Sequence, residues 1–221
     1  MKIADLMRLI IFLLLPSALN AAQYATVRSG KEEFSAKVSY LDTMVIEGQN
    51  NSQVDLTDDV GFAFEFGYNY SEHLNISLEL SYNQPGYTAT VITDEADPRE
   101  IISRNILDVW NSQLNATYNF FANEFTPFIS AGLGWSYMDS RLATGQHDGF
   151  CVWDPWYGYV CGEVQDTYDV YNFSYNVKAG LRWDIDDNLF LIANYGTYWY
   201  DFDYAKTINS ETVQLQVGMK Y

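Results

Sequence analysis

The chain has 221 residues, of which 17% are aromatic and only 19% are charged, and its formal net charge is −17. Without a cleavable N-terminal segment of about twenty residues, roughly 200 residues remain, which is the length of one folded domain. The high aromatic and low charged content excludes a disordered chain. The negative charge excludes nucleic-acid binding, because phosphate groups would be repelled. Two cysteines and two histidines, widely spaced, exclude a Cys/His zinc site, and we expect neither a metal nor a cofactor.

The first segment of the chain has the pattern of an export signal. Lys2 and Arg8 precede an apolar run over residues 9–15, and the segment ends on two alanines at 21–22. Asp5 and Arg8 interrupt the segment well short of the roughly 20 apolar residues that a spanning helix needs. We therefore predict a cleaved signal peptide over residues 1–22 and one domain over residues 23–221, with an uncleaved anchor as the alternative.

The rest of the chain alternates with a period of two residues. Between Val60 and Tyr70, apolar and aromatic residues occupy every second position, with small or polar residues between them. Such alternation predicts β-strands with one apolar and one polar face. Eight strands follow from this pattern, at residues 33–41, 60–70, 74–83, 106–120, 126–137, 171–185, 189–199 and 212–221.

The links between the predicted strands alternate between short and long. The short links lie near residues 71–73, 121–125 and 186–188, and the long ones near 42–59, 84–105, 138–170 and 200–211. An even number of strands, with short turns at one end and long loops at the other, is typical of outer-membrane barrels. The predicted fold is all-β, an eight-stranded antiparallel up-and-down transmembrane β-barrel, in the outer membrane of a Gram-negative bacterium.

The last strand carries a second signal for an outer-membrane barrel, an aromatic residue at its end. Apolar residues occupy every second position of this strand, at Val213, Leu215, Val217, Met219 and Tyr221. The pattern resembles the terminal-strand signal that the bacterial barrel-assembly machinery reads. An ordinary amphipathic edge strand would show the same alternation, although not the same aromatic end.

Three stretches of the chain carry a family resemblance. They are Gly67-Tyr68-Asn69-Tyr70 followed by residues 75–80, the run from Thr126 to Trp135, and Ala179-Gly180-Leu181-Arg182-Trp183 continuing into residues 189–195. In order and spacing, they resemble the small eight-stranded outer-membrane barrels, the OmpA-like and OmpX-like β-barrel domain family. The resemblance implies a monomer in outer-membrane lipid and lipopolysaccharide. Since the sequence stops at the last strand, we expect no periplasmic cell-wall tether.

Five charged residues fall on the polar face of their predicted strands, and we expect them in the lumen. They are Lys37, Glu65, Glu79, Lys178 and Arg182. The interior of an eight-stranded barrel is just wide enough to be filled by side chains, so these charges should meet in one salt-bridge cluster. A structural plug is the simpler interpretation. The OmpA resemblance implies the alternative, a gate in a narrow diffusion pore.

Catalysis is the least expected function. Some eight-stranded outer-membrane barrels modify lipid A, but such chemistry needs a serine, a histidine and an acidic partner in one site. His73 falls in a short turn, while His147, beside Asp148, falls in the longest loop with Asp139 and Ser140 nearby. Nothing in the sequence orders them as a triad, so we predict no enzyme and no catalytic residue.

The long loops are the most distinctive part of the sequence. They are strongly acidic, which predicts soluble loops or, alternatively, weak divalent-cation binding shared with lipopolysaccharide. The third loop contains Cys151 and Cys161 on either side of Trp153, Trp156 and Tyr157. We predict that the two cysteines form an intramolecular disulfide, which export permits. These aromatics suit either a binding patch for an unknown host or surface ligand or a structural lid or girdle. The sequence thus favours a structural or surface-binding (adhesion-like) role, with a gated pore as the rival.

Overall fold

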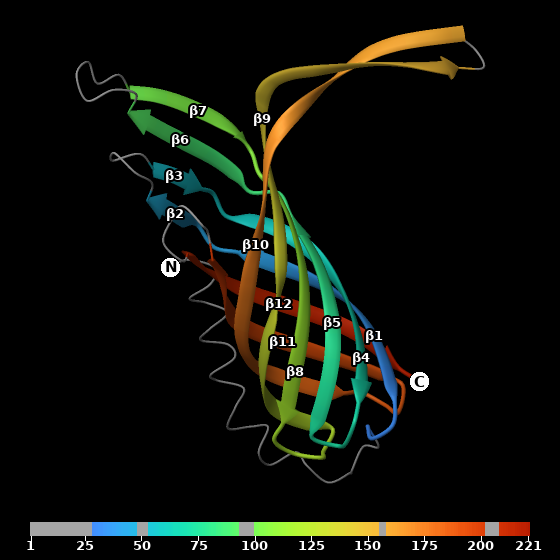
Figure 1. Cartoon of the computed structure of the whole chain (residues 1–221). Helices are drawn as coiled ribbons and strands as arrows, with labels where there is room; N and C mark the ends of the chain where they lie inside the picture. The colour runs from blue at the N-terminus through green and yellow to red at the C-terminus, as the bar shows by residue number, and fades with distance from the viewer. Residues whose placement is uncertain (1–27, 48–52, 93–99, 155–157, 202–207) are drawn as a thin grey trace.

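A computed structural model describes residues 28–47, 53–92, 100–154, 158–201 and 208–221, with the backbone alone at residues 47, 91–92, 100–103, 143–154 and 158–166. Within these ranges, no helix is long and apolar enough to cross a membrane. Twelve strands occupy the described ranges, and eight of them close into a barrel (Figure 1).

The barrel strands are all antiparallel to their neighbours. Their order around the barrel is β1 (Glu32–Leu41), β12 (Ile208–Lys220), β11 (Leu189–Asp201), β10 (Gly158–Asp184), β9 (Phe125–Asp154), β8 (Asp108–Asn119), β5 (Leu74–Asn83) and β4 (Asp59–Asn69), which pairs back to β1. The seam between the first and last strands runs from Glu33 opposite Lys220 to Leu41 opposite Thr212. Each of the eight predicted strands corresponds to one of these barrel strands.

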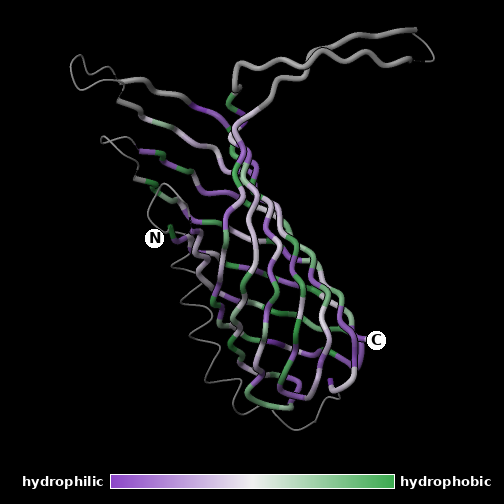
Figure 2. The backbone as a smooth tube through the Cα atoms, in the orientation of Figure 1, coloured by the Kyte–Doolittle hydropathy of each residue, from purple (hydrophilic) through white to green (hydrophobic). Residues whose placement is uncertain are grey.

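Alternation along each strand separates a membrane face from a lumen face. On β4, for example, Phe62, Phe64 and Phe66 are exposed on the outside, whereas Ala63 between them is buried inside. Hydrophobic and hydrophilic colours alternate along the barrel strands in Figure 2. Apolar side chains outside and polar side chains inside are what a lipid environment requires of a barrel.

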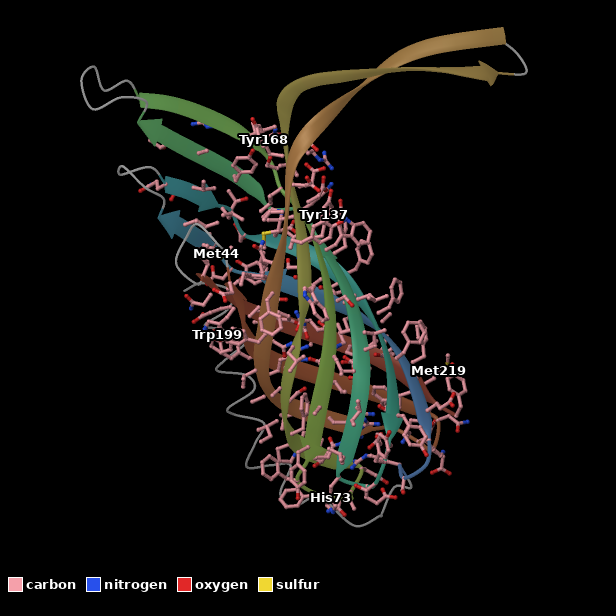
Figure 3. The ribbon with its side chains drawn as sticks, in the orientation of Figure 1. Met44, His73, Tyr137, Tyr168, Trp199 and Met219 are labelled. Carbon is pink, nitrogen blue, oxygen red and sulfur yellow. The ribbon has the colours of Figure 1, made fainter. Side chains whose placement is uncertain are left out.

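Aromatic pairs mark both ends of the outer surface. At the end with long loops, the rings of Tyr82 and Trp110 lie 4.4 Å apart. At the end with short turns, the rings of Tyr68 and Tyr70 lie 5.0 Å apart. In Figure 3, His73 marks the short-turn end, which is periplasmic in this class of barrel. The two aromatic bands bound the part of the barrel that crosses the membrane.

The first two long links, predicted as loops, contain strands in their described residues. They contain β2 (Met44–Glu47), β3 (Gln53–Leu56), β6 (Gly86–Ile92) and β7 (Glu100–Ile106), which form a separate four-stranded sheet in that order. The two loops meet where β3 pairs with β6. β2 and β3 have only four residues each, the shortest run in which alternation indicates a strand. The pairing of β3 with β6 joins segments distant in sequence, which no local pattern predicts.

The described residues of the third long loop are also in β-strands. Beyond the rim, β9 and β10 continue as a two-stranded ribbon, residues 139–154 paired with residues 158–169, which we call the ribbon. In Figure 1, the ribbon bends to one side of the barrel mouth and the sheet of β2, β3, β6 and β7 leans to the other. At the rim, Arg141 adopts a φ of 52°, a left-handed conformation that is uncommon outside glycine. The two strands therefore extend beyond residues 137 and 171, where the sequence analysis placed their ends.

Candidate functional site

A carboxylate at the middle of the lumen is bound from several strands at once. Lys37 and Lys178 each donate from Nζ to Oε2 of Glu79, both at 2.6 Å, and the Tyr198 hydroxyl donates to Oε1 at 2.6 Å. Lys37 also forms an ion pair with Glu65. Glu79 is fully buried, so its charge depends on these donors. We call Lys37, Glu65, Glu79 and Lys178 the central cluster.

Strand register explains why the central cluster forms. Glu65 lies directly opposite Glu79 on neighbouring strands, where two like charges would repel each other. The two lysines reach this pair from β1 and β10 and make the formal charge of the cluster zero. Gly196 makes room for one of them, because a Cβ at that position would lie 2.7 Å from Cγ of Lys178.

Arg182, which the sequence placed with the other four charges, lies in a second cluster nearer the periplasmic end. Its Nη1 donates to Oε2 of Glu33 at 3.1 Å, and its Nη2 donates to Oδ1 of Asp184 at 2.9 Å. Asp184 also accepts from Nζ of Lys220 at 2.9 Å and from Nε of Arg28 at 2.6 Å. The lumen charges therefore form two clusters rather than one, because opposite-charge partners are present at both heights. We call these five residues the periplasmic cluster.

Arg28 connects the periplasmic cluster to the short turns. Its side chain is completely buried, and its Nη1 donates to the carbonyls of Phe121, at 3.0 Å, and Glu72, at 3.3 Å. The Glu72 carboxylate accepts from the Arg28 backbone N–H at 3.0 Å. Nearby, Lys31 donates to the carbonyl of Asp187 at 2.7 Å. The segment before β1 thus contacts all three short turns and covers the periplasmic mouth.

The strand pattern could have found three of the members that sequence reasoning missed. Glu33 lies an even number of residues from Lys37 on the same strand and therefore shares its inward face. Asp184 lies two residues from Arg182 and shares the inward face of that residue. Lys220 likewise alternates with the outward residues of the last strand. Arg28 precedes the first predicted strand, so no periodic signal places it in the lumen.

The extracellular mouth is closed by apolar packing. Val109, Met138, Tyr198 and Tyr200 form one buried cluster inside the upper barrel, and Leu107 packs against it. Leu107 also packs against a second buried cluster, formed by Met44, Leu56, Tyr87, Ala89 and Ile208. The four-stranded sheet therefore caps the mouth, and we call it the lid.

A hydrogen bond joins the lid to the base of the ribbon. The Tyr87 hydroxyl donates to the carbonyl of Ser140 on β9 at 2.9 Å. Burial raises the pKa of this tyrosine, so it remains a neutral donor across the ordinary pH range. The lid is thereby fixed to the part of the ribbon that lies nearest the barrel rim.

Little space remains between the two charged clusters. A cavity of about 20 Å³ lies between them, lined by Lys37, Lys178 and Arg182 among others. That volume holds about one water molecule, since a buried water needs roughly 10–15 Å³. The described side chains around this cavity thus leave room for about one water molecule between the two clusters.

The residues weighed for catalysis make mainly backbone contacts where the structure describes them. Nδ1 of His73 lies 2.8 Å from the carbonyl oxygen of Asn119, in a short turn. The Ser140 hydroxyl donates to the carbonyl of Tyr168 at 2.9 Å, and Asp139 accepts from the Arg141 N–H at 2.8 Å. The side chain of His147 lies outside the described part of the chain.

The ribbon carries the cysteines and aromatics predicted for the third loop. Cys151 lies directly opposite Cys161 in the backbone register, and Trp153 lies opposite Tyr159. Trp156 and Tyr157 fall outside the described residues. The capping sheet comes from the first two loops, so the aromatic ribbon is not the lid described above.

The proposed assembly signal occupies the outer face of β12. Leu215, Val217, Met219 and Tyr221 are exposed there, and Val213 shares their side of the strand but is buried. The Tyr221 N–H donates to the carbonyl of Glu32 at 3.0 Å. The terminal residue therefore takes part in the seam that closes the barrel.

A closed eight-stranded antiparallel barrel with an apolar outer band, aromatic ends, short turns and long loops is an outer-membrane β-barrel. The family model "Outer membrane protein beta-barrel domain" matches residues 11–221. The chain belongs to this family, and its place is the outer membrane of a Gram-negative bacterium.

Solved structures confirm the fold. Neisserial surface protein A superposes with a TM-score of 0.56 at 12% identity, covering 87% of this chain and 100% of that one. OprG from Pseudomonas aeruginosa gives a TM-score of 0.52 at 10% identity over 90% and 99% of the two chains. AlkL gives 0.50 at 13% identity over 90% and 94%. No curated protein matches the sequence significantly.

Proposed function

We propose that this protein is a surface-binding outer-membrane barrel that contacts its partner through the ribbon. The observation that supports this role is the contrast between a filled, capped lumen and a β-ribbon that extends beyond the rim (Figure 1). A filled lumen leaves the extracellular parts as the surface available for function. The role needs no catalytic group and no cofactor.

The composition of the ribbon indicates the chemistry of its partner. Between residues 142 and 170, it carries five acidic residues and no lysine or arginine, so a basic partner surface is favoured electrostatically. Trp153 and Tyr159 add aromatic area of the kind that binding surfaces use. The proposed ligand is therefore a protein surface on host cells or matrix that carries lysine and arginine.

The experiment compares bacteria that display the wild-type protein with bacteria that display a ribbon-shortened variant. In the variant, residues 145–166 are replaced by an Asn-Gly turn, which suits a tight hairpin. Attachment is measured on epithelial monolayers and on immobilised basement-membrane matrix. We expect the shortened variant to lose attachment while its barrel keeps heat-modifiable migration on gels. Equal attachment by both strains would refute the adhesion role.

A matched pair of variants tests the aromatic contribution. The W153A/Y159A variant removes two residues on one face of the ribbon, and V152T/V160T changes the pair on the other face. We expect the first variant to weaken attachment and the second to leave it nearly unchanged. Loss of thermal stability with unchanged attachment in the first variant would instead identify a structural ribbon.

A gated pore is the second candidate, and the ionic composition of the lumen favours it. The central and periplasmic clusters are held by ion pairs, which can exchange partners without unfolding a strand. Planar-bilayer recordings on the refolded protein would decide. Conductance that rises in Arg182→Met or Arg28→Met supports a gate, whereas negligible conductance in all three proteins supports a plug.

We further infer that the barrel is a monomer, in contact with lipid and lipopolysaccharide, and that the barrel-assembly machinery inserts it. The aromatic seam residue Tyr221 supports this route. Deleting Tyr221 should reduce insertion into the outer membrane without reducing export. Normal insertion of that deletion would exclude the signal.

A further inference from the structure

The ribbon needs something other than the barrel to set its register. Pairing of β9 with β8 ends at Asp139, and pairing of β10 with β11 ends at Phe173. Beyond these points, the described strands of the ribbon pair only with each other. An isolated two-stranded ribbon is marginally stable in water.

The barrel cannot transmit its own register to the ribbon. The pairing shifts between Gln165 and Thr167, and again between Thr167 and Asp169. These irregularities separate the distal part, residues 147–165, from the well-ordered ladder below. In addition, both faces of the distal part mix apolar and polar residues, and such strands specify their register weakly.

One pair of residues can set the distal register covalently. Cys151 and Cys161 occupy directly opposite positions, near the end of the ribbon. Opposite residues in antiparallel strands have Cα atoms about 4.5–5.5 Å apart, within the usual disulfide range of about 4.4–6.8 Å. A bridge at this register position therefore needs no rearrangement of the backbone.

The same register places an aromatic pair next to the cysteines. Trp153 and Tyr159 are opposite each other, two residues closer to the tip, and so fall on the same face as the cysteine pair. Val152 and Val160 fall on the other face. A slip of one residue would exchange the two faces, so whatever fixes the register also decides which face is aromatic.

We propose that Cys151 and Cys161 form a cross-strand disulfide that locks the register of the ribbon and thereby presents the Trp153–Tyr159 face to the partner. The role in presenting a binding face rests on the proposed surface-binding function. The formation of the disulfide itself does not. It assigns the cysteines a role in selecting the binding face as well as in closing a loop.

The oxidation requires a disulfide-donor protein of the periplasm. The thiolate of one cysteine attacks the donor's disulfide and forms a mixed disulfide. The second thiolate then attacks the first cysteine's sulfur and releases the donor as a dithiol. Two electrons and two protons pass from the cysteine pair to the donor.

The first test measures thiols in protein isolated from outer membranes under alkylating conditions. We expect mass spectrometry to find no alkylated cysteine before reduction and two after it. Reduction should increase ribbon cleavage by chymotrypsin on the order of 100-fold, as expected for opening a loop of about ten residues. Two alkylated cysteines before reduction would overturn the proposal.

A register-shifted variant is the matched control. In C161S/G162C, the two cysteines fall one position out of register and on opposite faces. We expect the native pair to be fully oxidised and the shifted pair to remain mostly reduced. Equal oxidation of both pairs would show that the register is not specified, which contradicts the proposed register-locking disulfide.

The attachment assay separates this inference from the proposed function. A fully oxidised wild-type protein that fails to attach refutes the surface-binding role and leaves the disulfide in place. Attachment that persists unchanged in C151S/C161S refutes the register-locking role and leaves surface binding in place.

Discussion

The two mouths of the barrel are closed by different physical means. At the extracellular end, a sheet buries Met44, Leu56 and Tyr87 against Ile208. At the periplasmic end, the charged side chain of Arg28 binds turn carbonyls and Asp184. Apolar closure depends on buried area, whereas ionic closure depends on every partner being present.

Loop length explains the difference between the two mouths. The long extracellular links have enough residues to form four strands with an apolar face. The periplasmic links, between β4 and β5, β8 and β9, and β10 and β11, have only four or five residues each. Turns this short expose carbonyls but cannot cover an opening, so one long donor side chain closes it.

The largest expected effect comes from removing the carboxylate that three cations share. Asp184→Ala leaves Arg28, Arg182 and Lys220 without their common partner. We expect a loss of about 3–5 kcal/mol in unfolding free energy, because breaking a buried pair leaves uncompensated charge. Urea unfolding in phospholipid vesicles measures it, with exposed Asp187→Ala as the control. Equal stability of the two variants would contradict ionic closure.

Truncation in the lid tests the apolar mouth. Leu56→Ala removes a side chain that is only 3% exposed, which costs about 2–5 kcal/mol in a packed core. We expect the loss to appear as faster amide exchange in β2, β3, β6 and β7, while the barrel strands keep their protection. The exposed Val45→Ala is the matched control. A parallel loss of barrel protection would show that lid and barrel unfold together.

Tyr198 lies where the two kinds of packing meet, since it belongs to the upper apolar cluster and donates to Glu79. Tyr198→Phe keeps the ring and removes the hydrogen bond to the charged Glu79, which contributes about 1.5–3 kcal/mol. It also removes the long hydrogen bond that the hydroxyl accepts from Nε2 of Gln214, at 3.3 Å. We expect a stability loss within this range and unchanged exchange in the lid, both measurable in vesicles. No loss would mean that the two lysines and Asn115 satisfy Glu79 without the tyrosine.

The smallest expected effect lies in a periplasmic turn. The backbone N–H groups of Asn188 and Leu189 donate to Asp186, each at 2.7 Å, and lower the pKa of its carboxyl group. A lowered folded-state pKa contributes stability above the ordinary value, near 3.9, that is lost as pH falls through the folded value. Asp186→Asn should therefore be slightly less stable at pH 7, with the difference shrinking below about pH 4. A pH-independent difference would exclude this linkage.

The two-residue alternation along each strand was the sequence feature that told most about the lumen. It placed Lys37, Glu65, Glu79 and Lys178 inside, and the structure joins these four. Alternation alone could not predict that Arg182 contacts Glu33, because the positions of residues on distant strands along the barrel axis depend on the stagger between strands.

The sequence by itself determined the eight barrel strands, their inside and outside faces and the positions of the short and long links. These properties follow from a two-residue period and from turn length, both of which are local. Only the tertiary structure decided that two loops form the lid, that Arg28 closes the opposite mouth and that Cys151 lies opposite Cys161. These features depend on contacts between segments distant in sequence, and no local pattern encodes which distant partner a segment will meet.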